Sequence, residues 1–67
     1  MIELHVNGEQ QLVVAGSTLF DLIERLELVG QRIAIEVNQE IIPRSQHSDY
    51  VLKAGDAVEV VQAIGGG

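Results

Sequence analysis

Hydrophobic residues occupy every second position at the start of the chain and predict a β-strand. Ile2, Leu4 and Val6 alternate with polar residues, which is the pattern of a strand with one buried face. The pair Asn7-Gly8 follows, and both residue types tolerate the positive φ angles of a two-residue type I′ turn. We therefore expect residues 10–14 to form a second strand that folds back antiparallel on the first.

A helical spacing of apolar residues follows this hairpin. Thr18 stands three residues before Asp21 and resembles the first residue of a capping box, with Asp in place of the usual Glu. The helix should therefore begin at Leu19, and Gly30 is the expected stop. Four apolar residues recur at the helical period and define one buried stripe: Leu19, Leu22, Ile23 and Leu26.

The second half of the chain predicts two further strands. Residues 33–37 alternate as the first strand does, and the short apolar pair Ile41-Ile42 follows before a proline, which suits the edge of a sheet. Residues 44–50 are polar and predict a loop or a single helical turn. The alternation restarts at residues 58–60 in a final strand.

These elements predict an α+β fold built around one helix. A right-handed crossover through the helix would place the third strand in the same sheet as the hairpin, with the apolar stripe covering one sheet face. The expected architecture is a β-grasp roll, which is a mixed sheet of four to five strands packed on one helix. We expect residues 1–61 to form this domain and residues 62–67 to form a flexible tail.

Size and composition favour a single small globular domain. The chain has 67 residues, of which 46% are hydrophobic. It contains no cysteine, which excludes a disulfide scaffold, a thiolate metal site and a cysteine nucleophile. The net charge of −6 disfavours binding to nucleic acid and favours partner proteins with basic surfaces. No apolar run has the length of a membrane span or a signal peptide, so we expect a cytoplasmic protein that binds no membrane.

Side chains of types that serve in catalysis or metal binding lack the settings that such chemistry needs. Asp21, Glu24 and Glu27 share one side of the predicted helix without an enclosing pocket, so we interpret them as a solvated face. His5 and His47 lie far apart without a patterned set of further ligands, which argues against a metal site. We therefore interpret the protein as the substrate and carrier of other enzymes' chemistry, with no bound cofactor, and not as an enzyme.

Three consecutive glycines stand at the C-terminal end of the sequence. Gly65, Gly66 and Gly67 have no side chains and lose much entropy on ordering, which predicts a mobile and thin tail. Fully extended, residues 62–67 reach roughly 20 Å at about 3.3 to 3.6 Å per residue, enough to thread a narrow channel in a partner. A partner could then convert the carboxyl group of Gly67 to an acyl-adenylate. The alternative is that the glycines are frayed or a cloning remnant.

Apolar residues just before the glycines are the candidate docking surface for partners. Alternation along the last strand points Val61 and Ala63 away from the core, and Ile64 has no obvious core role. The alternative is that all three pack on the edge of this domain's own core. Arg44, one of four basic residues, could pair either with an acidic partner or with this domain's own carboxylates.

Short motifs follow one another in order along the chain: Asn7-Gly8, Gly16-Ser17-Thr18-Leu19, Ala34-Ile35-Glu36-Val37-Asn38, Ile41-Ile42-Pro43-Arg44, Leu52, Gly55-Asp56-Ala57-Val58 and Gly66-Gly67. Each motif is weak alone, but the ordered set at this length resembles the ubiquitin-like sulfur-carrier proteins, and most closely the ThiS family of thiamine biosynthesis. The resemblance covers essentially the whole chain. The small subunit of molybdopterin synthase is similar in its Gly-Asp turn and diglycine end, but it is usually longer.

The resemblance implies a ubiquitin-like β-grasp fold and a carrier function. It implies that an E1-like enzyme uses ATP to adenylate Gly67 and that the carboxyl group then becomes a thiocarboxylate. Gly65 and Gly66 would thread the enzyme's active site. The implied partners are this adenylating enzyme, a sulfur donor such as a cysteine desulfurase or a rhodanese, and a thiazole synthase that receives the sulfur. A carrier for another pathway and a ubiquitin-like protein modifier remain the alternatives.

Overall fold

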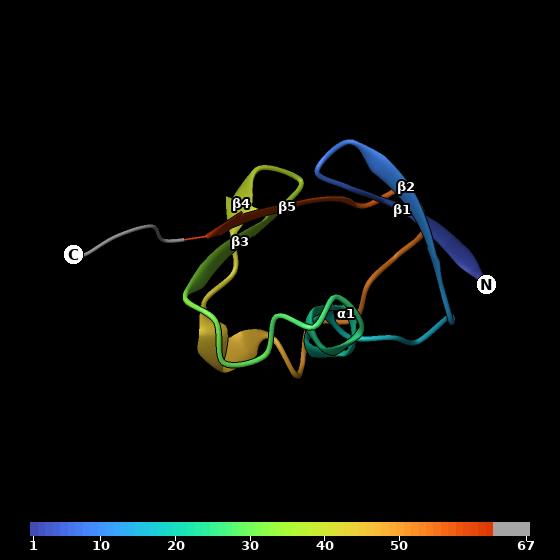
Figure 1. Cartoon of the computed structure of the whole chain (residues 1–67). Coiled ribbons are helices and arrows are strands. Elements are labelled where there is room, and N and C mark those ends of the chain that lie inside the picture. The colour runs from blue at the N-terminus through green and yellow to red at the C-terminus, as the bar shows by residue number, and fades with distance from the viewer. Residues whose placement is uncertain (63–67) are drawn as a thin grey trace.

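One helix packs across one face of a five-stranded sheet (Figure 1). The structure is a computed structural model and describes residues 1–62. The strands lie in the order β2-β1-β5-β3-β4. The elements along the chain are β1 (Ile2–Val6), β2 (Glu9–Val13), α1 (Leu19–Arg25), β3 (Ile33–Val37), β4 (Glu40–Ile41), the 3-10 turn η1 (Arg44–Gln46) and β5 (Ala57–Gln62).

The first and last strands lie side by side in the middle of the sheet. β1 and β5 are parallel, with His5 opposite Ala57 and Val6 opposite Val58. All other strand pairs are antiparallel, so the sheet is mixed. The predicted roll, a mixed sheet packed on one helix, is confirmed. The final strand runs over Ala57–Gln62, so it extends two residues beyond the alternation at residues 58–60 and includes Gln62, which we expected in the tail.

The two hairpins turn through residue pairs with positive φ angles. Asn7 and Gly8 have φ angles of 50° and 83°, as the predicted type I′ turn requires. The same conformation recurs at Asn38 and Gln39, with φ angles of 52° and 71°. The first turn uses only these two residues, so β2 begins at Glu9, one residue earlier than expected.

Helix α1 begins as predicted and ends earlier. The backbone N–H of Asp21 donates to the Thr18 hydroxyl at 3.2 Å, and the N–H of Thr18 donates to the Asp21 carboxylate at 2.8 Å, which completes the capping box. The helix does not run towards Gly30, because Glu27 adopts a left-handed conformation with φ 61°. The N–H groups of Glu27 and Leu28 then donate to the carbonyls of Glu24 and Ile23, both at 3.0 Å. This is a Schellman motif with a glutamate where glycine is usual.

The core lies between α1 and the inner face of the sheet. The segment that contains η1 closes one end of it and buries His47, which the sequence pattern had placed in a polar loop. The imidazole Nε2 of His47 lies 2.9 Å from the carbonyl oxygen of Ile42 and donates to it, so the buried ring keeps a hydrogen bond. The buried hydrophobic residues are Leu4, Val6, Val13, Leu19, Leu22, Ile23, Ile35, Val37, Ile42, Leu52 and Val58.

Candidate functional site

Strand β5 is the last element of the described chain, and it ends at Gln62, immediately before the candidate residues at the C-terminal end of the sequence. It lies between β1 and β3, and its C-terminal end lies beside the start of β3, on the opposite side of the molecule from the N-terminus (Figure 1). Val58 is buried on the helix side, whereas Val61 is 57% exposed on the outer side. The docking candidate Val61 is thus accessible. The other candidates, Ala63, Ile64, Gly65, Gly66 and Gly67, lie outside the described residues.

The side chain of Asn7 holds β5 where β1 has already ended. The N–H of Val60 donates to Asn7 Oδ1 at 2.8 Å, and Asn7 Nδ2 donates to the carbonyl of Val60 at 3.4 Å. The side-chain amide of Asn7 therefore bonds the backbone of Val60 as the backbone of one more β1 residue would, and extends the parallel ladder between β1 and β5. This fixes the strand immediately before Val61.

The second hairpin turn holds the other end of β5 in the same way. The N–H of Asn38 donates to the carbonyl of Ala57 at 2.8 Å, and the N–H of Ala57 donates back to Asn38 Oδ1 at 3.0 Å. Asn38 Nδ2 also donates to the carboxylate of Asp56 at 3.0 Å. Asn38, Asp56 and Ala57 all stand within the short motifs of the sequence, but sequence reasoning did not predict that they hold β5.

We expect Asn7→Gly to loosen the end of β5 without disturbing the hairpin. Glycine keeps the positive φ angle of the turn but removes the acceptor for the Val60 N–H. Loss of one such hydrogen bond, about 1 kcal/mol, should speed hydrogen exchange of the Val60 amide roughly fivefold. Asn7→Asp keeps the acceptor and is the matched control. Equal exchange rates in both variants would refute the anchoring role.

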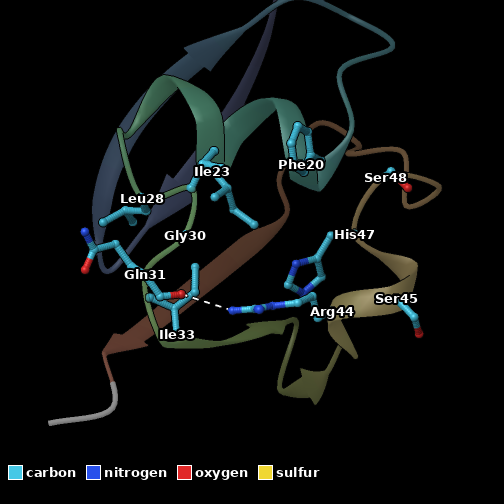
Figure 2. A pocket seen from close by; sticks show the side chains of 11 residues that line it. Phe20, Ile23, Leu28, Gly30, Gln31, Ile33, Arg44, Ser45, His47 and Ser48 are labelled. Atoms are coloured by element: carbon cyan, nitrogen blue, oxygen red, sulfur yellow. Dashed lines mark hydrogen bonds between the residues drawn. The ribbon is translucent and has the colours of Figure 1, made fainter. Parts of the chain in front are cut away.

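A pocket of about 440 Å³ lies between α1, the segment that follows it and η1 (Figure 2). Phe20, Ile23 and Leu28 contribute apolar walls, and Arg44 crosses the opposite side. Arg44 Nη2 donates to the backbone carbonyl of Gln31 at 3.1 Å, so the guanidinium links η1 to the segment before β3. Among residues 1–62, the side chains that line this pocket include no carboxylate.

The acidic side chains of helix α1 and the segment after it lie at the surface. Asp21 caps the helix, and Glu24 and Glu27 are exposed, as predicted. Within these residues no cluster of three or more His, Cys, Asp or Glu side chains is placed to hold a metal ion. Burial, with Asp56 and Glu40 nearby, raises the pKa of Tyr50, so its hydroxyl stays protonated at neutral pH.

The architecture defines a class of protein. A mixed sheet with parallel central strands, crossed by one helix, is the ubiquitin-like β-grasp fold. The ThiS family model matches residues 4–67, and the chain belongs to the ThiS family. Among residues 1–62, no helix has the length and apolar character that a membrane crossing requires.

The chain is similar to sulfur carriers and to part of longer thiazole synthases. The chain is 30% identical to the sulfur carrier protein ThiS of Escherichia coli, over 98% of this chain and 100% of that protein. It is 36% identical to a thiazole synthase of Magnetococcus marinus, over 98% of this chain but 20% of that protein, so it spans about a fifth of the length of that relative. A crystal structure of thiamine biosynthesis protein ThiS from Geobacter metallireducens superposes with a TM-score of 0.84 at 29% identity, covering 98% of this chain and 100% of that one.

Proposed function

We propose that this protein carries sulfur for thiamine biosynthesis, as a thiocarboxylate on the carboxyl group of Gly67. The observation that carries the proposal is the family match over residues 4–67, which reaches the three glycines. The names of the Escherichia coli and Geobacter metallireducens relatives, a sulfur carrier and a thiamine biosynthesis protein, support it.

The chemistry requires activation of a poor electrophile. In this scheme a carboxylate oxygen of Gly67 attacks the α-phosphorus of ATP in an E1-like enzyme, and pyrophosphate leaves. A persulfide sulfur then attacks the acyl carbon and displaces AMP, which gives an acyl disulfide. Reduction of the S–S bond by a thiol leaves the terminal thiocarboxylate and a new disulfide. Because the chain has no cysteine, the persulfide must come from a donor such as a cysteine desulfurase or a rhodanese.

The carrier supplies a shaped substrate and no catalytic group of its own. Anchoring of β5 by Asn7 gives residues 62–67 a fixed point of departure. Gly65 and Gly66 present backbone alone to a narrow active site. Exposed Val61, with Ala63 and Ile64, would contact the enzyme around its entrance. ATP is a reactant of the partner enzyme, and the proposal includes a cytoplasmic location for the carrier.

Thiazole synthase is the proposed acceptor of the sulfur. Two relatives that bear this name contain a stretch that matches almost the whole of this chain within a much longer protein. Covalent linkage of a carrier-like domain to a synthase would raise its effective concentration at the synthase active site. The same transfer between separate proteins requires docking of the two surfaces. These names favour thiamine synthesis over molybdopterin synthesis and over a ubiquitin-like protein modifier.

The proposal is tested by the intact mass of the protein. Incubation with ATP, the cognate adenylating enzyme and a sulfur donor should raise the mass by about 16 Da, the difference between sulfur and oxygen, localised to Gly67. Deletion of Gly67 should abolish the shift while the thermal unfolding temperature is retained. A ladder of lysine conjugates without the thiocarboxylate would instead support a protein modifier. No mass change with an enzyme active on another carrier would refute both functions.

A further inference from the structure

Two of the four basic residues gather beside the end of β5. A shallow pocket of about 400 Å³ is lined by Arg32, Ile33, Ala34, Arg44 and Val61, with no acidic residue among them. The whole chain has ten acidic residues and a net charge of −6. Arg32 and Arg44, which we name the arginine patch, therefore form a local region of opposite sign on an acidic protein. The remaining basic residues, Arg25 and Lys53, do not line this pocket.

Strand register fixes the arginine patch next to the C-terminal residues. Ala34 pairs with Val61 and Ile33 pairs with Gln62, so Arg32 immediately precedes the pairs that end the sheet. The acidic pair Glu36 and Glu59 lies two residue pairs further along the same strands. Charge on these two strands therefore changes from acidic in the sheet to basic at the end from which residues 63–67 continue.

The arginines are both exposed and unneutralised within the described part of the chain. Among residues 1–62 the sole close contact between a basic and an acidic side chain joins His5 to Glu3 and includes neither arginine. Arg44 donates one of its five N–H groups to the carbonyl of Gln31, and this hydrogen bond holds the guanidinium in place (Figure 2). Arg32 makes no hydrogen bond with its side chain in the same range. Of the two possibilities left by the sequence for Arg44, pairing with carboxylates of residues 1–62 is not observed.

We propose that the arginine patch docks a carboxylate-bearing surface at the entrance of the adenylating enzyme's active-site channel. This inference rests on the proposed function, since it assumes that the enzyme takes up residues 62–67. The rim of a channel that admits these residues must meet the surface around Val61, and the arginine patch is part of that surface. A basic patch on an otherwise acidic protein orients the encounter and excludes reversed approaches. At this end of the molecule the partner surface is therefore acidic, and not basic as the net charge alone suggested.

The test compares two double variants that change the net charge equally. Arg32→Gln/Arg44→Gln removes the arginine patch, and Arg25→Gln/Lys53→Gln removes the other two basic residues. Pyrophosphate release is measured at varied carrier concentration with the adenylating enzyme and ATP. We expect the first variant to raise the KM for the carrier about tenfold at low salt, with kcat unchanged at saturation. The KM of the control should change less than about twofold, and added salt should shrink the difference.

Each outcome decides the proposal. Equal KM values for the two double variants overturn it. If Arg32→Gln/Arg44→Gln has a normal KM but transfers sulfur poorly to thiazole synthase, the patch binds the synthase and the proposal is overturned. If the wild type self-associates and this variant does not, the patch binds a second copy of this chain and the proposal is overturned. If wild-type protein releases no pyrophosphate with an enzyme active on another carrier, the proposed function fails and this inference with it. Arg32→Gln alone removes no hydrogen bond within residues 1–62, so it should leave the fold unchanged. It must still raise the KM if the higher KM of the double variant reflects lost docking and not altered folding.

Discussion

Gly66→Val is expected to abolish adenylation of the Gly67 carboxyl group while the fold is retained. Valine adds a β-branched side chain where a narrow channel admits backbone alone, and it restricts the φ and ψ angles available to the extended chain. Displacement of the carboxylate from the α-phosphorus of ATP by about 1 Å is enough to lower the rate about 100-fold. The measurement is ATP-dependent pyrophosphate release, with thermal unfolding of the same sample.

Gly66→Ala is the graded control for this effect. A single methyl group should produce a smaller loss than valine if the restriction is steric. Thermal unfolding of both variants should match the wild type, because position 66 lies beyond the folded elements that contain the core. An unchanged adenylation rate for Gly66→Val would show that the residues before Gly67 do not pass through a narrow channel.

Leu22→Ala is expected to destabilise the domain severely. Leu22 is 1% exposed between α1 and the sheet, and its removal leaves a cavity at the centre of a small core. Buried Leu→Ala substitutions cost about 2–5 kcal/mol, which is a large share of the roughly 5 kcal/mol available to a domain of this size. Alanine favours helix formation, so the loss reports packing and not helix propensity. Chemical denaturation monitored by circular dichroism measures the change.

Phe20→Ala provides the matched control on the same helix. Phe20 is 39% exposed at the rim of the pocket beside α1, so its truncation should cost less than half as much. Equal losses for the two variants would contradict the assignment of Leu22 to the core. The two largest effects also differ in kind, because Leu22→Ala reduces carrier activity through unfolding, whereas Gly66→Val reduces it in a folded protein.

The turns, the helix start and most strands were predictable because their causes are local. Positive φ at Asn7 and Gly8 follows from the two residue types, and the capping box needs only Thr18 and Asp21. The third strand has the predicted bounds, Ile33–Val37, because alternation over five residues leaves one face to bury. The helix end was wrong, since it relies on a left-handed Glu27, a residue type that rarely adopts this conformation.

Within the site, alternation along the last strand predicted that Val61 is exposed. It did not predict the hydrogen bonds from Asn7 to β5 or the position of Arg32 and Arg44 beside Val61. Asn7 was recognisable as a turn residue, but its partner Val60 lies 53 residues away. Burial of His47 was missed for a similar reason. Its polar neighbours predicted a loop, and its ring nevertheless closes the core by donating to the Ile42 carbonyl.

The sequence by itself determined the order of elements, the stripe of core residues and the three glycines that suit a carrier, because each depends on neighbouring residues or on a short period. Tertiary structure alone decided that β5 lies between β1 and β3. Because of that pairing, the Val60 N–H near the end of β5 donates to the side-chain amide of Asn7. The same pairing brings Arg32 and Arg44 together beside Val61. Such contacts join residues distant along the chain, and their formation depends on the free energy of packing the whole sheet against the helix, which no local pattern encodes.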